Sequence, residues 1–119
     1  MELENFSNLC KNPKMKEKLE KLNETSNPEK QYRIVQIILE YINVCFLTQN
    51  RKINLKDSDI INIGNEYDKI DNELSKLIMR VNGLYNIYDE NGVDEDDVDY
   101  LLYQVDKIYE IIRDKYGDI

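Results

Sequence analysis

The spacing of apolar residues predicts an all-α protein. From Tyr67 to Tyr88, and again from Val98 to Ile112, apolar residues recur at alternating steps of three and four, the period of one helix face. These stretches predict helices at about 65–89 and 94–117. The short connection ENGV between them predicts a long antiparallel helical hairpin in the C-terminal half.

Two Asn-Pro pairs predict where the earlier helices begin. An Asn side chain accepts hydrogen bonds from free amides at a helix start, and Pro suits the first helical position because it lacks an N–H. The pairs at 12–13 and 27–28 therefore predict helices at about 13–23 and 28–49.

The remaining element is a short helix predicted at 57–63, which Asp57 or Ser58 could cap. Gly64 weakens helix continuity, so we expect a break there, before residue 65. With 119 residues, few glycines and few prolines, the chain is predicted to be a single helical domain over 1–119, arranged as a small four-helix bundle.

The predicted helix 28–49 is apolar on most of its circumference. The polar residues in its middle are Gln36, Glu40 and Asn43, which lie along one line. Such a helix is covered by its own bundle or by a partner, so a homo-oligomer through this helix is an open possibility. The apolar run is shorter than the ~20 residues of a membrane span, and no membrane association is expected.

Charge is distributed unevenly along the chain. The formal net charge is -8 at pH 7. The segment Lys11–Arg33 has seven basic and four acidic side chains, whereas Asp89–Asp99 has seven acidic side chains and no basic one. Direct nucleic-acid binding requires a basic face, so this balance favours a basic protein surface as the partner.

The residue types needed for common catalytic centres are missing from the sequence. There is no histidine, and Cys10 and Cys45 are isolated, which is typical of reduced thiols in a cytoplasmic protein. The N-terminal segment has no signal-peptide pattern, and no glycine-rich phosphate loop is present. We therefore expect a cytoplasmic protein that is not an enzyme and has no cofactor.

The carboxylates have two metal-binding interpretations. If Gly92 takes the turn position of a calcium loop, the first and twelfth ligand positions fall on Ile87 and Val98, which cannot bind the ion. The three-residue steps Asp68/Asp71 and Asp94/Asp97 resemble the ExxE and ExxD pairs of all-helical metal-dependent nucleotide hydrolases. Such a site needs carboxylates that converge between helices, which this pattern does not predict. A looser Ca²⁺ or Mg²⁺ site near Asp94 and Asp97 is a further alternative, but the prediction is that there is no metal site.

The acidic segment has a structural and a functional interpretation. Acidic residues at a helix start are stabilised by free amides and by the helix dipole, but this can use only one or two of the seven. Solvation and binding both remain open for the others. Tyrosines flank the segment and cannot all be buried, and exposed tyrosine beside carboxylates is typical of interfaces. The residues predicted to bind a partner are Tyr85, Asp89, Glu90, Asp94, Glu95, Asp96, Asp97, Asp99, Tyr100 and Tyr103.

The favoured hypothesis is a non-enzymatic acidic inhibitor that occupies a basic, nucleic-acid-binding surface of another protein. Its size and charge resemble those of small anti-CRISPR and anti-restriction inhibitors from phages and mobile elements. One alternative is a helical-bundle immunity protein or antitoxin, because the ten-residue string RVNGLYNIYD resembles a segment of some bacteriocin immunity proteins. Another alternative is a structural, homo-oligomeric subunit.

Overall fold

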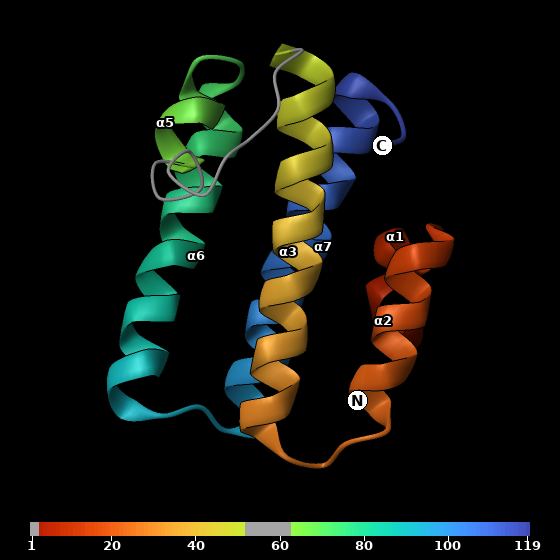
Figure 1. Cartoon of the computed structure of the whole chain (residues 1–119), viewed down its shortest axis with the longest axis vertical. Coiled ribbons are helices and arrows are strands. Elements are labelled where there is room, and N and C mark those ends of the chain that lie inside the picture. Colours follow the sequence, from red (N-terminus) through yellow and green to blue (C-terminus); the bar gives the residue numbers. More distant parts are fainter. Residues whose placement is uncertain (1–2, 52–62) are drawn as a thin grey trace.

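The computed structural model describes residues 3–51 and 63–119, and these residues are built from helices without any strand (Figure 1). In chain order the elements are η1 Leu3–Phe6, α1 Ser7–Cys10, α2 Pro13–Asn23, α3 Pro28–Arg51, α5 Ile63–Asp68, α6 Asn72–Asn91 and α7 Glu95–Tyr116. The predicted all-α class is confirmed.

The long helices α3 and α7 form the centre of the molecule. They contact each other, and α2 packs against α3 while α6 and α1 pack against α7. Figure 1 shows α6 and α2 on opposite sides of this central pair, with α5 beside the start of α6. The turn that joins α6 to α7 therefore lies at the same end of the molecule as the connection between α2 and α3 (Figure 1).

The hydrophobic core is one continuous cluster to which every described element contributes a buried side chain. In α3, Val35, Ile38, Ile42 and Phe46 have no exposed surface. The predicted apolar helix is therefore covered by the other helices of the same chain over most of its circumference.

The predicted helix starts at Pro13 and Pro28 are confirmed. The Asn12 side chain accepts hydrogen bonds from the backbone N–H groups of Lys14 at 3.0 Å and Met15 at 3.4 Å. Asn27 accepts from the N–H of Glu29 at 2.9 Å in the same way. The helix predicted over 13–23 has those bounds, and the helix predicted over 28–49 continues to Arg51.

The prediction of one helix over 65–89 is wrong, because the chain turns between α5 and α6. The backbone N–H groups of Ile70 and Asp71 both bond to the Tyr67 carbonyl, which closes a tight turn. Asp71 then has an extended backbone and caps α6, accepting from the Leu74 N–H at 3.1 Å. The apolar spacing runs through this turn unbroken because α5 folds back on α6 and both bury their apolar residues.

The predicted break near Gly64 borders residues 52–62, which lie outside the described residues; Gly64 itself lies in the first turn of α5. A Cβ atom at this position would lie 3.0 Å from the Met79 side chain, so the glycine permits close packing of α5 on α6. The Ser75 hydroxyl donates to the Gly64 carbonyl at 2.8 Å and fixes this contact. Of the helix predicted at 57–63, all but Ile63 lies outside the described residues.

The N-terminal elements η1 and α1 were not predicted. They dock on α7 through the buried side chains of Phe6 and Leu9. Asp106 of α7 is buried and accepts hydrogen bonds from the Leu9 N–H at 3.0 Å and the Asn8 carboxamide at 3.1 Å. This carboxylate therefore satisfies free donors of a helix that lies far away in the sequence.

Candidate functional site

The turn between α6 and α7, residues 92–94, lies in the middle of the acidic segment Asp89–Asp99. We call this segment the acidic tip. Gly92 ends α6 with a φ of 86°, a left-handed conformation that favours glycine, and its N–H bonds to the Tyr88 carbonyl at 2.8 Å. The chain then enters α7 at Asp94, which has an extended backbone. The helix predicted over 94–117 is thus α7 with Asp94 as its N-cap and Gly117 as its C-cap.

Two of the seven carboxylates are used to start α7. The Asp94 side chain accepts from the Asp97 N–H at 2.8 Å, and the Asp97 side chain accepts from the Asp94 N–H at 3.1 Å. This reciprocal pair is a capping box, with Asp in the place where Glu is usual. The helix-start interpretation therefore accounts for Asp94 and Asp97.

A third carboxylate ties two helices together. The Tyr32 hydroxyl of α3 donates to Asp89 of α6 at 2.9 Å. Burial, together with the hydrogen bond and the charge of Asp89, raises the pKa of Tyr32, so its hydroxyl remains a donor at neutral pH. Asp89 thus has a structural role in addition to its negative charge.

The remaining carboxylates of the tip have no such role. Glu90, Glu95 and Asp96 are exposed and make no side-chain hydrogen bond within residues 3–51 and 63–119. Asp99 is half-buried, and its Oδ1 atom is buried without a hydrogen-bond partner. Across the described part of the chain, none of the seven forms an ion pair with a Lys or Arg.

The tyrosines near the tip divide into two groups. Tyr100 and Tyr103 are 49% and 60% exposed on the outer side of α7. Tyr88 is buried, as its place in the apolar spacing predicts. Tyr85 also turns inward: its ring packs edge-to-face on Tyr32 with the ring centroids 5.8 Å apart. The predicted binding residues therefore do not share one surface, because Tyr85 lies between α3 and α6.

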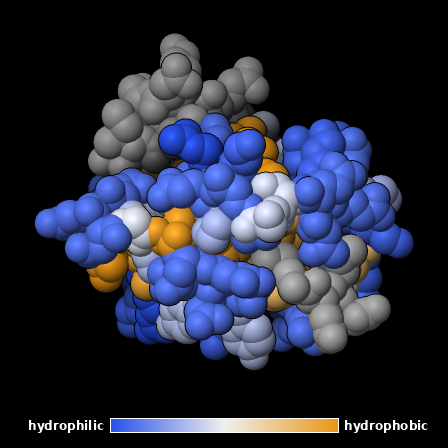
Figure 2. Space-filling model, turned by 90° about the horizontal axis from the view of Figure 1, so that it is seen from below, coloured by the Kyte–Doolittle hydropathy of each residue, from blue (hydrophilic) through white to orange (hydrophobic). Residues whose placement is uncertain are grey.

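In the structure Glu29 also lies at the acidic tip. The sequence did not indicate this position. Glu29 lies in the first turn of α3 and lines, together with Asp94 and Asp97, a shallow cavity of about 460 Å³. Only the packing of the helices brings this residue to the tip. Figure 2 views this end of the molecule and shows a mostly hydrophilic surface with small apolar areas.

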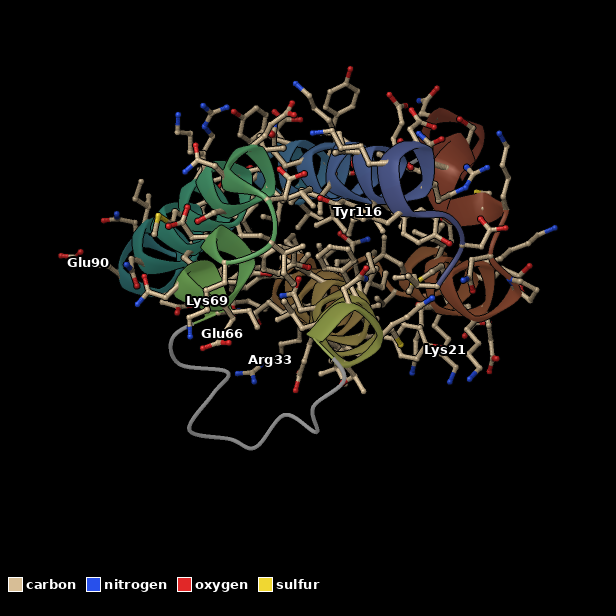
Figure 3. All side chains as sticks on the ribbon, turned by 90° about the horizontal axis from the view of Figure 1, so that it is seen from above. Lys21, Arg33, Glu66, Lys69, Glu90 and Tyr116 are labelled. Atoms are coloured by element: carbon tan, nitrogen blue, oxygen red, sulfur yellow. The ribbon has the colours of Figure 1, made fainter. Side chains whose placement is uncertain are left out.

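The basic residues of α2 lie away from the tip. In Figure 3, Glu90 projects from one side of the molecule and Lys21 of α2 lies on the other. Lys21 is paired with Glu17 of its own helix, with the two charged groups 3.9 Å apart. Burial and the nearby Asp97 and Asp94 raise the pKa of Tyr88 at the tip, consistent with a negative local field.

The carboxylates do not form the metal centre that the hydrolase interpretation would need. Asp71 caps α6 at the end of that helix away from Asp94 and Asp97, so the two pairs do not converge. Within the ranges that the structure describes, no group of three or more Cys, Asp or Glu side chains is arranged to hold a metal ion. No described helix is long and apolar enough to cross a membrane.

The fold and the site together define an all-helical protein with an acidic end formed by α3, α6 and α7. Comparison with models of protein families, with curated proteins and with solved structures finds no match to this chain. The function must therefore be inferred from the site itself.

Proposed function

We propose that this protein is a non-enzymatic binding protein whose acidic tip occupies a basic surface on a partner protein. The observation that carries the proposal is the absence of ion pairs among the seven carboxylates over the described residues. Concentrated, unpaired charge of one sign steers a partner of the opposite sign and accelerates association.

The partner class that we propose is a protein with a nucleic-acid-binding groove. Such grooves are basic and are spaced to receive rows of phosphates. Carboxylates at the tip would take the place of phosphates, as in small phage inhibitors of CRISPR and restriction systems. Tyr100 and Tyr103 would add exposed aromatic area beside the charge.

The helices on both sides of the tip support the same proposal. We propose that α2, α3, α6 and α7 act as a four-helix bundle whose α6–α7 hairpin holds the backbone of the acidic residues in place. The contacts of α2 with α3, of α3 with α7 and of α6 with α7 support this arrangement. A fixed array loses less conformational entropy on binding than a flexible acidic tail would.

The test compares a triple variant of the tip with a control variant that loses the same number of charges elsewhere. Glu90→Gln, Glu95→Gln and Asp96→Asn together remove three exposed charges from the tip. Glu17→Gln, Glu20→Gln and Asp114→Asn remove the same charge elsewhere and serve as the control. Biolayer interferometry against a panel of purified nucleic-acid-binding proteins would measure association, with a DNA oligonucleotide as competitor.

We expect wild type to bind at least one panel member, to be displaced by the oligonucleotide, and to associate about tenfold faster than the tip variant at low salt. The difference should shrink as salt rises, because the charges are screened. Equal association rates for the tip variant and the control variant would contradict the proposal.

A homo-oligomer through α3 is a second proposal, favoured by two exposed apolar residues on that helix. Ile37 is 47% exposed and Val44 is 36% exposed, whereas most of the other apolar residues of α3 are buried. Light scattering over a concentration series should show a stable oligomer that Ile37→Glu disrupts. A monomer at all concentrations would exclude it.

A further inference from the structure

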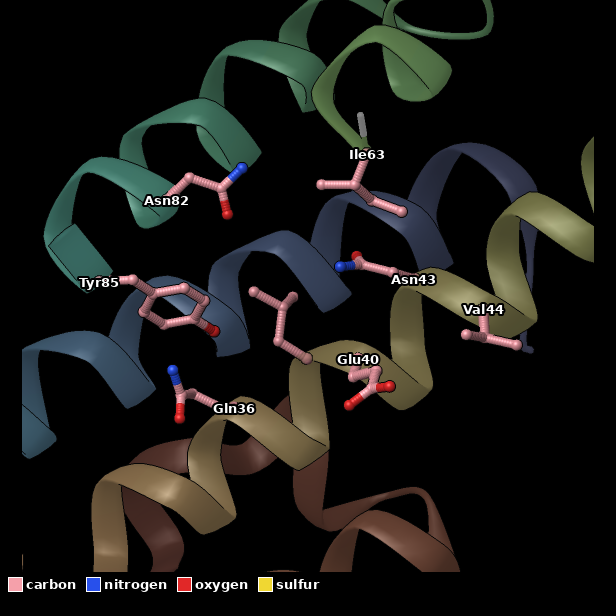
Figure 4. Close-up of a pocket in the computed structure, with 8 residues that line it drawn as sticks. Gln36, Glu40, Asn43, Val44, Ile63, Asn82 and Tyr85 are labelled. Atoms are coloured by element: carbon pink, nitrogen blue, oxygen red, sulfur yellow. The ribbon is translucent and has the colours of Figure 1, made fainter. Parts of the chain in front are cut away.

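The polar line on α3 faces a groove between α3 and α6. Gln36, Glu40 and Asn43, which interrupt an otherwise apolar helix, line a cavity of about 410 Å³. Asn82 and Tyr85 of α6 line the opposite side (Figure 4). Two helices therefore turn polar residues toward the same groove.

These polar groups are left available for hydrogen bonding. Asn43 accepts from the Tyr67 hydroxyl at 2.6 Å, which fixes its oxygen, and Figure 4 shows its nitrogen turned toward the groove. Gln36, Glu40 and Asn82 make no side-chain hydrogen bond or ion pair with any described residue. The Tyr85 hydroxyl is buried without a hydrogen-bond partner and lies beneath the groove surface, so it is not itself a contact point for a ligand.

The groove continues to the acidic tip. Gln36 also lines a neighbouring cavity of about 380 Å³ that includes Glu29, Arg33 and Asp89. Glu29 in turn lines the cavity at the tip. From Glu29 to Asn43, α3 rises about 21 Å, which matches about six residues of extended chain.

The charges along the groove favour a cationic occupant. Glu29, Asp89 and Glu40 contribute carboxylates, and Arg33 contributes the one cation among the residues described as lining it. Burial, with the nearby Tyr32 and the negative charges of Glu40 and Asp89, raises the pKa of Tyr85, so its hydroxyl is a donor at neutral pH. The groove thus offers acceptors for a guanidinium group and, in the Asn43 carboxamide nitrogen, a donor for a carbonyl oxygen.

We propose that the groove between α3 and α6 binds an extended peptide segment that carries arginine. A guanidinium group would bond to Glu40 and to the carboxamide oxygens of Gln36 and Asn82, and a peptide carbonyl would accept from the carboxamide nitrogen of Asn43. The identity of this segment as part of the basic partner rests on the proposed function. The tip would attract that partner, and the groove would select an arginine within it.

The binding test uses defined peptides. The probe is a six-residue peptide of alternating arginine and serine with blocked ends. The same peptide with citrulline for arginine removes the charge and keeps the shape, and N-acetylarginine amide supplies one guanidinium without the extended chain. Two-dimensional NMR of ¹⁵N-labelled protein follows the side-chain amide signals of Gln36, Asn43 and Asn82 during titration.

We expect the arginine peptide to shift these three signals and to bind at least about fivefold more tightly than either comparison ligand. Equal binding of the citrulline peptide would overturn the proposed role of charge. Equal binding of N-acetylarginine amide would show a small-molecule pocket in place of a peptide site. Shifts confined to residues 89–99 would show that only the tip binds, and would also overturn the proposal.

Three variants separate a binding role from a structural one. Glu40→Gln should weaken the arginine peptide about fivefold, and Arg33→Gln should strengthen it about twofold, because the groove loses a negative or a positive charge. Glu20→Gln, an exposed acid on α2, is the control and should leave affinity unchanged. Unchanged affinity for both groove variants would overturn the inference.

The two proposals can fail separately. If the tip variant associates more slowly with basic proteins, but the arginine peptide does not shift the NMR signals of Gln36 and Asn82, the groove inference fails and the proposed function stands. If the peptide shifts those signals but the tip variant associates as fast as wild type, the groove stands and the tip function fails.

Discussion

The two ends of the α6–α7 pair use acidic residues in opposite ways. Where α6 begins, Asp71 accepts from the Leu74 N–H at 3.1 Å, from the Tyr116 hydroxyl at 2.6 Å and from Lys115 at 3.3 Å. Lys115 also pairs with Glu73 at 2.7 Å. We call the group Asp71, Glu73, Lys115 and Tyr116 the paired end; both of its carboxylates face a donor or a cation.

At the tip, by contrast, only some of the carboxylates have a structural partner. Asp94 and Asp97 cap α7, but Glu90, Glu95 and Asp96 have no side-chain hydrogen bond or ion pair within the described ranges. The same fold therefore pairs acids at one end and leaves them unpaired at the other. The charge of the tip therefore exceeds what the helices use for capping and pairing.

The largest expected effect is at the core beneath the paired end. Phe46 is fully buried and stacks on Tyr67 with ring centroids 5.2 Å apart, and it meets Tyr116 edge-to-face at 5.0 Å. Phe46→Ala should lower the free energy of unfolding by ~3–5 kcal/mol, measured by urea denaturation. Ile87→Ala near the tip, where the side chain is 53% exposed, should cost far less. Equal losses would show that the two ends are packed alike.

The next effect concerns the cap at the paired end. Asp71→Ala removes a helix cap and the acceptor of two side-chain hydrogen bonds, so unfolding free energy should fall by ~2–3 kcal/mol. Glu73→Gln removes only an exposed partner of Lys115 and should cost under ~1 kcal/mol. If Asp71→Ala lowers the free energy of unfolding by less than Glu73→Gln does, the role assigned to Asp71 is contradicted.

The Asp71 effect should also depend on pH. Burial acts to raise the pKa of Asp71, but hydrogen bonds from Tyr116, the Leu74 N–H and Lys115 outweigh it and lower that pKa. A lowered pKa in the folded state stabilises the fold above the unfolded value of about 3.9, and the stabilisation is lost as pH falls through the folded value. The charge-dependent part of the gap between wild type and Asp71→Ala should therefore shrink between neutral pH and about pH 2. A constant gap would show that charge plays no part.

A smaller effect is expected in the groove. Tyr85→Phe removes a buried hydroxyl that has no hydrogen-bond partner, so unfolding free energy should stay the same or rise by up to ~1 kcal/mol. Tyr32→Phe, which removes a donor to Asp89, should lower it by about 1 kcal/mol. Destabilisation by Tyr85→Phe would show that the hydroxyl is structural.

The smallest effect is expected at the tip. Glu90→Gln, Glu95→Gln and Asp96→Asn together should change unfolding free energy by less than ~0.5 kcal/mol. Loss of the favourable helix-dipole interaction at the start of α7 is offset by relief of repulsion. Thermal unfolding at low and high salt would measure the balance. A large destabilisation would mean that these residues are needed for the fold, as those of the paired end are.

The starts of helices could be predicted from sequence because they depend on neighbouring residues. Asn12, Asn27 and Asp94 each cap a helix through backbone amides two or three residues away. The turn at Asp71 is local too, but the apolar spacing continues across it and therefore gave no sign that the chain changes direction between α5 and α6. A capping residue inside a regular apolar pattern is the signal that could have revealed it.

The composition of the site depended on packing and could be predicted only in part. The charge of the tip is visible in the sequence, but the place of Glu29 beside Asp94 depends on how α3 packs against α7. Tyr85 faces α3 because Tyr32 lies opposite it, 53 residues away in the sequence. The polar line on α3 could be recognised in the sequence, but the position of Asn82 across the groove from it could not.

The docking of α1 on α7 has a consequence for synthesis of the chain. The hydrogen bond from the Leu9 N–H to Asp106 joins residues 97 positions apart. At about 5–20 residues per second, a ribosome needs roughly 5–20 s to make the intervening chain. Phe6 and Leu9 therefore remain exposed on the nascent chain through that interval, because α7, on which they dock, is made later.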